Sequence, residues 1–179
     1  MTRRIGWIHL FTIVAALAVP GRVLAQAATA PQPLVMTATN LMAGDQRHKD
    51  VAQNGGDQNA LLAGDVVRYR LVFTNLNADS LRNVQFTNPI PGGLRYVAAS
   101  AGADRGDVTI DFSIDGGKTW SAQPMIDVVV DGKPVRKPAP VSQYTTIRWT
   151  VGGWVQSKSQ VTAEYKAELP APSGAPAER

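Results

Sequence analysis

Hydrophobic and polar side chains alternate with a period of two along most of the chain. The clearest example is the segment 66–73, in which Val67, Tyr69 and Leu71 alternate with arginines. The same alternation recurs in the segments 83–87, 109–114, 146–151 and 161–169. A period of two with one polar face is typical of antiparallel sheets that are half exposed to water. We therefore predict β-strands in these segments.

Turn-forming residues separate the predicted strands. Pro89 to Gly93 precedes a further strand over 94–100, and Asp131-Gly132 is a two-residue hairpin signal between strands 126–130 and 133–136. No window after the N-terminal segment shows a helical period. Seven to nine short strands predict an all-β fold, an immunoglobulin-like antiparallel β-sandwich, with a small barrel as the alternative. The polar stretch 43–60 is expected to be a mobile, irregular insertion.

The N-terminal segment has the features of a signal peptide. Arg3 and Arg4 supply positive charge, an apolar run follows to Val19, and residues 23–25 offer small side chains at the positions that a signal peptidase reads. The apolar run is shorter than the roughly 20 residues that span a bilayer, which disfavours the alternative of a retained membrane anchor. We predict a signal peptide at 1–25 with cleavage after Ala25, or secondarily after Ala27. The mature protein would be exported, periplasmic or extracellular, without a membrane span.

Charge and cysteine content limit the classes of function. Loss of Arg3, Arg4 and Arg22 with the signal peptide lowers the formal net charge from +4 to +1, and no block of like charges remains to indicate nucleic-acid binding. The chain has 0 cysteines, which excludes disulfides, thiol catalysis and cysteine-ligated metals. The expected organisation is a flexible lead at 26–33, one sandwich domain at 34–169 and a disordered tail at 170–179.

Residues 113–120 read Ser-Ile-Asp-Gly-Gly-Lys-Thr-Trp. This octapeptide resembles the Asp-box of sialidases and other propeller glycosidases, in which it is a structural hairpin away from the catalytic centre. A propeller needs one such hairpin per blade, and this chain has one copy. We therefore predict a structural turn whose aspartate accepts backbone N–H groups and whose tryptophan packs beneath it. Its residues are Ser113, Asp115, Gly117, Thr119 and Trp120.

A second resemblance covers residues 61–100, which read LLAGDVVRYRLVFTNLNADSLRNVQFTNPIPGGLRYVAAS. This segment resembles the conserved-repeat domain of bacterial surface and exported proteins, a family catalogued as domain of unknown function number eleven. The matching residues are Gly64, Asp65, Tyr69, Asn75, Pro91, Gly93, Leu94, Tyr96 and Val97. The family usually has Asp-Thr-Leu-Pro where this chain has residues 88–91, Asn-Pro-Ile-Pro. The resemblance implies an immunoglobulin-like sandwich of the cell envelope, here in a single copy, with no catalytic residues.

Residues that could support catalysis or metal binding are few. His48 is the one histidine after the signal peptide, and we expect it to be an exposed loop residue without a partner. Asp111 and Asp115 are not expected to face one another as the two carboxylates of a glycosidase do. One histidine without any cysteine cannot form a zinc site, and no cofactor is expected. The aspartates that could bind calcium follow no EF-hand spacing, and loop solubility is the preferred interpretation; they are Asp45, Asp50, Asp57, Asp104 and Asp107.

Aromatic residues offer the remaining candidate contacts. Trp149 is expected in the core and Trp120 in the hairpin. Trp154 follows two glycines, and a buried role is preferred for it. The candidate ligand contacts are nevertheless Trp154 and Tyr144, because exposed aromatic rings bind sugars. The tripeptide 105–107, Arg-Gly-Asp, is interpreted as a turn.

These patterns favour an exported, non-enzymatic β-sandwich module with a structural or interaction role in the bacterial cell envelope. The alternative is a carbohydrate-binding accessory protein, and a hydrolase ranks third because no acid–base or nucleophile–base pair can be assembled. Expected partners are another envelope or surface protein, or a glycan. The last strand, 160–169, is interpreted as a sheet edge protected by its charges and by Pro170, which predicts a monomer or at most a weak dimer.

Overall fold

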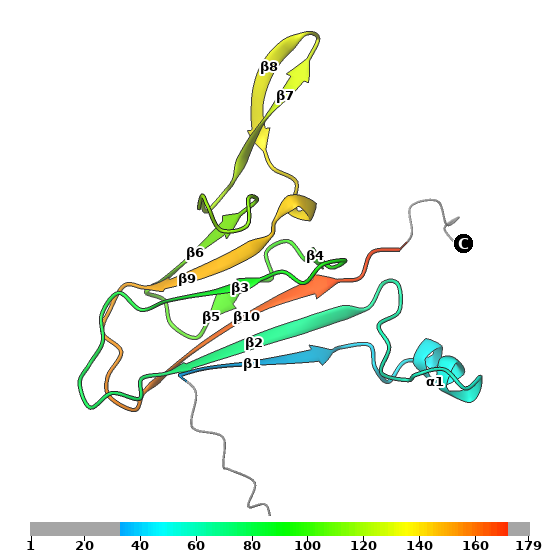
Figure 1. The fold of residues 1–179 in the computed structure, drawn as a ribbon, viewed down its shortest axis with the longest axis horizontal. Helices are drawn as coiled ribbons and strands as arrows, with labels where there is room; N and C mark the ends of the chain where they lie inside the picture. Colours follow the sequence, from blue (N-terminus) through cyan, green and yellow to red (C-terminus); the bar gives the residue numbers. More distant parts are fainter. Residues whose placement is uncertain (1–32, 172–179) are drawn as a thin grey trace, which may run out of the picture. The chain divides into compact units, whose positions relative to one another are not determined.

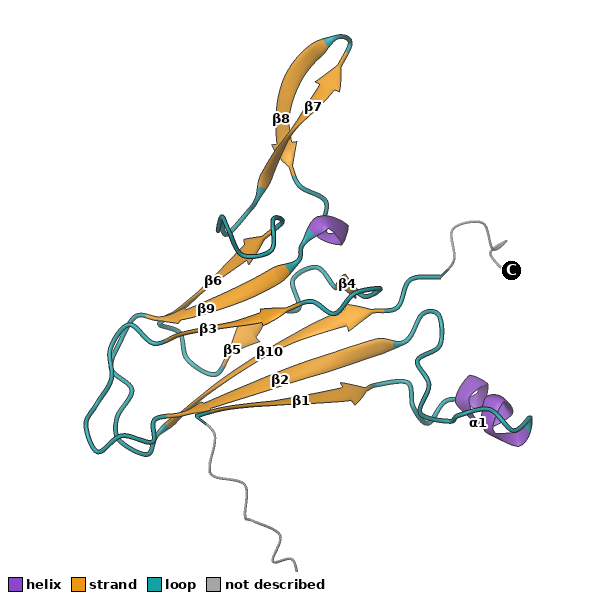
Figure 2. Cartoon of the chain, in the orientation of Figure 1, coloured by secondary structure: helices purple, strands orange, loops and turns teal. Residues whose placement is uncertain are grey.

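The computed structural model describes residues 33–171. The predicted signal peptide lies outside the described residues, as do residues 26–32 of the predicted lead and residues 172–179 of the predicted tail. The described chain is almost entirely strand and loop (Figure 2). Its elements, in order along the chain in Figure 1, are β1 (Leu34–Asn40), α1 (Gln46–Gln53), β2 (Val66–Thr74), β3 (Gln85–Pro89), β4 (Arg95–Tyr96), β5 (Gly102–Ala103), β6 (Val108–Ser113), β7 (Met125–Val130), β8 (Lys133–Pro138), the 3-10 helix η1 (Val141–Gln143), β9 (Thr146–Val151) and β10 (Gln160–Glu168).

The strands form two main sheets and one separate hairpin. The larger sheet has the order β1-β2-β10-β4, with β5 also paired to β10, and the smaller sheet has the order β3-β9-β6. Strands β7 and β8 pair with one another. Every strand pair is antiparallel. The predicted all-β antiparallel sandwich is confirmed, with ten strands in the described residues.

The core lies between the inner faces of the two main sheets. Alternate residues of β2, β9 and β10 point into it, as the period-two pattern predicts. Trp149 is fully buried, in agreement with its expected core position, and its ring stacks on Phe86 at 5.7 Å between centroids. Tyr69 and Tyr165 stack at 4.9 Å from neighbouring strands of the larger sheet. The buried apolar residues of this core are Val67, Tyr69, Leu71, Val84, Phe86, Tyr96, Ile147, Trp149, Val151, Val155, Val161, Ala163, Tyr165 and Ala167.

The insertion at 43–60 contains the helix α1, so the expectation of irregular structure without any helical segment is wrong. Asp45 caps the helix, because its carboxylate accepts the backbone N–H of His48 at 3.1 Å. Of the eight residues of α1, only His48 is buried. A helix held by a cap and one buried polar ring has no apolar stripe, and a search for hydrophobic periodicity therefore misses it.

The predicted strand at 94–100 is much shorter in the structure. Only Arg95–Tyr96 forms β4, and the chain then turns through Ala99, whose φ is +57°, before Gly102–Ala103 forms β5. Both short strands lie against β10, and between them the hydroxyl of Ser100 accepts the N–H of Lys166 at 2.9 Å. The pairing of β4 and β5 with β10, together with the hydrogen bond of Ser100, thus replaces the continuous strand that the sequence predicted.

Strand β10 is internal, so its interpretation as a sheet edge is wrong. It pairs with β2 along its whole length and with β4 and β5 on its other side. Alternation along a sequence reports which side chains are buried, but it does not report how many neighbouring strands there are. The charges of Glu164 and Lys166 stand on the outer face of the sheet rather than at its border.

The hairpin predicted from Asp131-Gly132 is confirmed. Strands β7 and β8 pair from Met125↔Pro138 to Val130↔Lys133 and leave these two residues as the loop. The φ values of Asp131 and Gly132 are +50° and +74°. Positive φ at both central residues is the geometry of a type I′ turn, whose twist matches that of antiparallel strands.

Candidate functional site

The Asp-box segment forms a tight turn after β6, and Asp115 organises it. The Asp115 carboxylate accepts the backbone N–H groups of Lys118 at 3.0 Å and Thr119 at 2.9 Å. It also accepts the hydroxyls of Ser113 and Thr119, each at 2.7 Å. The Ser113 hydroxyl in turn accepts the N–H of Gly117 at 2.8 Å. The polar groups of this segment are therefore directed into its own backbone.

Trp120 lies over the turn and beside a charged pair. Its ring is 3.3 Å from the Cβ position of Gly117, where φ is +91°, so glycine is required both by the backbone and by the ring. On the ring, the guanidinium of Arg148 lies 4.6 Å from the centroid. Arg148 also forms an ion pair with Asp111 at 2.8 Å. Trp120 thus attaches the turn to the smaller sheet.

The same hydrogen bonds lower the pKa of Asp115 far below its ordinary value. The hydroxyl of Ser113 has the largest effect on this pKa, followed by the hydroxyl and backbone N–H of Thr119. All of these donors favour the ionised carboxylate. The ionised carboxylate is therefore the form that organises the turn.

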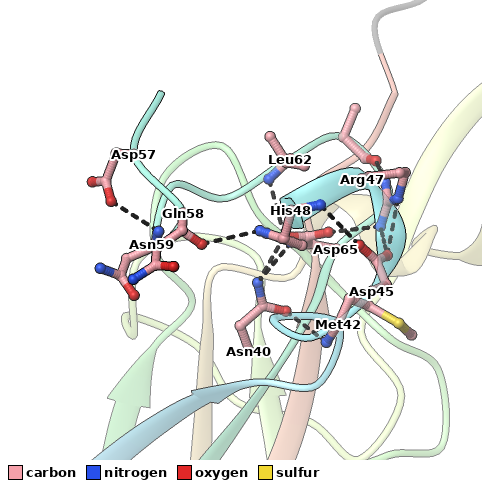
Figure 3. A network of polar contacts seen from close by, with 11 residues as sticks. Asn40, Met42, Asp45, Arg47, His48, Asp57, Gln58, Asn59, Leu62 and Asp65 are labelled. Carbon is pink, nitrogen blue, oxygen red and sulfur yellow. Dashed lines mark hydrogen bonds and ion pairs between the residues drawn. The ribbon is translucent and has the colours of Figure 1, made fainter. Parts of the chain in front are cut away.

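A second polar cluster surrounds the buried carboxylate of Asp65 (Figure 3). Asp65 is 0% exposed and accepts hydrogen bonds from Asn40 at 2.7 Å and from the backbone N–H of Leu62 at 3.0 Å. It also pairs with Arg47 at 2.9 Å and with His48 at 2.8 Å. These contacts join the end of β1, helix α1 and the loop before β2. The sequence-based reasoning missed this cluster, although the Gly-Asp pair of the family resemblance marks its centre.

His48 is buried at 2% exposure, so its assignment as an exposed loop residue without a partner is wrong. Its Nε2 faces Asp65, and its Nδ1 faces the backbone carbonyl of Gln58 at 3.2 Å. Both partners are hydrogen-bond acceptors, so the ring is held between a carboxylate and a carbonyl. These two contacts tie helix α1 to the loop before β2, which makes His48 a positioning group for that loop.

The pKa of Asp65 is lowered by its surroundings. Burial alone acts to raise this pKa, but the hydrogen bonds that the carboxylate accepts outweigh burial, first among them that from Leu62. The ionised form is therefore the stable form in the folded protein. Its negative charge is paired with the Arg47 guanidinium, and the His48 ring lies against it.

Trp154 is exposed, which corrects the preference for a buried role. Its exposed fraction is 53%, and the guanidinium of Arg82 lies 4.9 Å from the ring centroid. The two glycines before Trp154 leave β9 at its C-terminal end, where Arg105 donates to the Trp154 carbonyl at 3.1 Å. The backbone at this position is held, and the ring is presented to solvent.

Tyr144, the other candidate ligand contact, lies elsewhere. It precedes β9, whereas Trp154 follows it, and six strand residues at about 3.3 Å each separate the two sites by about 20 Å. The Tyr144 ring stacks with Tyr96 at 5.8 Å and lies 4.8 Å from Phe112, beside a groove of about 300 Å³. The structure therefore does not bring the two candidates into one binding surface.

Three of the remaining aspartates have local structural partners. Asp107 forms an ion pair with Arg105 at 2.6 Å, so both charged groups of the Arg-Gly-Asp tripeptide are engaged with one another. Asp45 caps α1, and Asp57 accepts the backbone N–H of Asn59. Within residues 33–171, no group of three or more histidine, cysteine or acidic side chains is placed to hold a metal ion.

Comparison of the chain with protein-family models, with curated proteins and with solved structures finds no match. The resemblance to the conserved-repeat domain therefore stays a prediction. In the described part of the chain, no helix combines the length and apolarity needed to cross a membrane.

Replacing Asp115 tests the structural role of the Asp-box turn. Asp115→Ala removes one acceptor for four donors, so we expect thermal unfolding to occur a few degrees lower, with the far-ultraviolet strand spectrum unchanged. The matched control is Asp79→Ala, at an exposed loop aspartate. Equal melting temperatures for Asp115→Ala and wild type would contradict the structural role.

The Asp65 cluster predicts a pH-dependent stability difference. At pH 7, Asp65→Asn should lower the free energy of unfolding by about 2–4 kcal/mol, because the buried donors lose a charged acceptor. A lowered folded-state pKa stabilises the fold above the unfolded pKa of about 3.9, and this contribution disappears as pH falls through the folded pKa. The difference between variant and wild type should therefore shrink between about pH 5 and pH 2.

Arg47→Gln is the control for that experiment, because the Arg47 side chain is 47% exposed. An ion pair with an exposed partner contributes little, so this variant should lose clearly less stability than Asp65→Asn. Denaturant titrations across the pH range measure both variants. A difference for Asp65→Asn that is constant with pH would contradict the assigned ionisation of Asp65.

Proposed function

We propose that this chain is an exported, non-enzymatic β-sandwich module with a structural or interaction role in the bacterial cell envelope. The observation that carries the proposal is the engagement of the His48 ring by acceptors on both nitrogens. This histidine is the residue that a nucleophile–base mechanism would need, and its remaining side-chain neighbour, Asn40, is neither a hydroxyl nor a thiol.

The acidic side chains support the same conclusion. Asp115 is directed into its own turn, Asp111 pairs with Arg148, and Asp107 pairs with Arg105. A glycosidase of the common kind needs two carboxylates facing one another across a cleft, one of which holds a proton. These three carboxylates are instead engaged by donors of their own, and the donors around Asp107 and Asp115 lower the pKa of those two carboxyls.

Export is tested by expressing the full chain in a Gram-negative host and fractionating the cells. We expect the protein in the periplasm or the medium with Gln26 as its N-terminus, measured by mass spectrometry. Ala25→Asp is the control, because it removes the small residue before the cleavage position and should shift cleavage to Ala27 or leave the precursor uncut. Intact Met1 on the exported wild-type protein would contradict the proposal.

A carbohydrate-binding role is the second candidate, and the exposure of Trp154 favours it. An aromatic ring at 53% exposure on a held backbone can offer a flat face to a sugar. Arg82 lies against the ring and would limit binding to its other face. Because Tyr144 lies about 20 Å away along β9, this candidate rests on Trp154 alone.

Glycan-array binding separates the two candidate functions. If the protein binds sugar through its exposed tryptophan, Trp154→Ala should lose at least tenfold in affinity and Trp154→Phe should retain part of it. Tyr144→Ala is the matched control and should bind like wild type. Absence of binding across the array, or binding unaffected by Trp154→Ala, would reject the carbohydrate role and leave the first proposal in place. Turnover of a glycoside or ester by the pure protein would reject both.

A further inference from the structure

The hairpin of β7 and β8 is exposed to an unusual degree for a strand pair. Four of the ten exposed large hydrophobic side chains of the described residues lie on it, namely Met125, Val129, Val130 and Val135, and Val129 is 75% exposed. Within residues 33–171, no other strand pairs with the hairpin (Figure 2). A two-stranded hairpin is only marginally stable by itself in water. Its apolar composition therefore indicates that a further strand completes it.

The hydrogen-bond register shows which backbone groups face outward. At the base of the hairpin, the N–H of Ala139 donates to the carbonyl of Pro124 at 2.8 Å, which makes that pair a hydrogen-bonded one. Hydrogen-bonded and non-hydrogen-bonded pairs alternate along an antiparallel ladder. Pro134 and Pro138, opposite Val129 and Met125, therefore occupy non-hydrogen-bonded positions, and their nitrogens face the free border of β8.

The two borders of the hairpin are consequently different. On β8, two of the three outward positions are prolines, which cannot donate, and Arg136 is the third. On β7, the outward positions are Met125, Asp127 and Val129, and all three retain a backbone N–H. Prolines and charges are the usual means of preventing strand addition. The border of β8 is blocked, while that of β7 is open.

We propose that β7 pairs antiparallel with β7 of a second copy of this chain. The sequence of β7 is complementary to itself about Val128. In this register Val128 lies opposite the partner's Val128, Ile126 opposite the partner's Val130, and Asp127 opposite the partner's Val129. One face of the new ladder consists of β-branched side chains, which form favourable cross-strand pairs. The contact is two-fold symmetric, so it closes as a dimer.

Charge selects this register over its neighbour. A shift of the two-fold axis to Asp127 would place two aspartates directly opposite one another, and like charges in that position are destabilising. The ladder involves one six-residue strand from each copy, which is a small interface. The dimer is therefore weak and reversible.

Two proline variants test the interface by sedimentation equilibrium. Wild type at about 100 μM should have a weight-average mass clearly above that of the monomer and should dissociate on dilution. Val129→Pro removes an outward N–H from β7 and should make the protein monomeric at the same concentration. Arg136→Pro, the matched control, places a proline at an equivalent outward position of β8 and should dimerise like wild type. Far-ultraviolet spectra check that both variants fold.

Disulfide trapping tests the register, because the chain has 0 cysteines of its own. Across the proposed axis, the two Val128 Cα atoms form a non-hydrogen-bonded pair about 4.5 Å apart, within the range of a disulfide. Val128→Cys should therefore become a covalent dimer under mild oxidation. Val135→Cys lies on β8, three strand spacings or about 14 Å from its copy, and should stay uncrosslinked.

A wild-type protein that stays monomeric at about 100 μM would overturn the proposal. So would a dimer that persists in Val129→Pro, because it would place the interface on another surface, such as the border of β1. Equal crosslinking of Val128→Cys and Val135→Cys would also overturn it, because random collision would then explain the covalent product.

Discussion

The buried carboxylate of Asp65 is the interaction on which the arrangement of the larger sheet depends. Burying a lone carboxylate costs several kcal/mol, on the order of what a small domain has in total, so it needs donors around it. They come from β1, α1 and the loop before β2, and the Asp65 carbonyl accepts the N–H of Leu169 after β10. At the other end of β2, the fully buried Asn75 donates to the carbonyls of Val155 and Gln156. Strands β2 and β10 are thus held in register at both ends.

Several further polar side chains are likewise engaged by groups of the chain itself. His48 has both nitrogens bound to acceptors, Asp115 closes its own turn, and Arg105 joins Asp107 to the backbone of Trp154. A small sandwich without disulfides needs such ties, because its core alone gives limited stability. The exposed Trp154 ring and the unpaired backbone of β7 are not used in this way, and both are groups suited to binding.

The sequence was sufficient for the features that depend on local pattern. Alternation located the strands that line the core, and Asp131-Gly132 located the β7–β8 turn. It was insufficient for the burial of side chains that depends on contacts between residues far apart in the sequence. His48 is buried because Asp65, seventeen residues later, accepts from it, and no spacing rule encodes that pairing. Trp154 is exposed because the chain leaves β9 at two glycines and the ring then points to solvent. The apolar residues around Trp154 in the sequence had favoured a buried position.

Proline near strands illustrates why register had to be known before edge protection could be interpreted. Pro170 follows β10 and suggested a blocked border, yet β10 has neighbours on both sides and needs no protection. Pro134 and Pro138 lie within β8 and do block a border, because each nitrogen faces away from β7. A proline removes the donor on one side of a strand only, so its effect depends on the parity of its position in the ladder. The hydrogen bond from Ala139 to Pro124 at the base of the hairpin shows which positions of the ladder face outward. The prolines of β8 occupy two of these positions, so strand addition is blocked at β8 and open at β7.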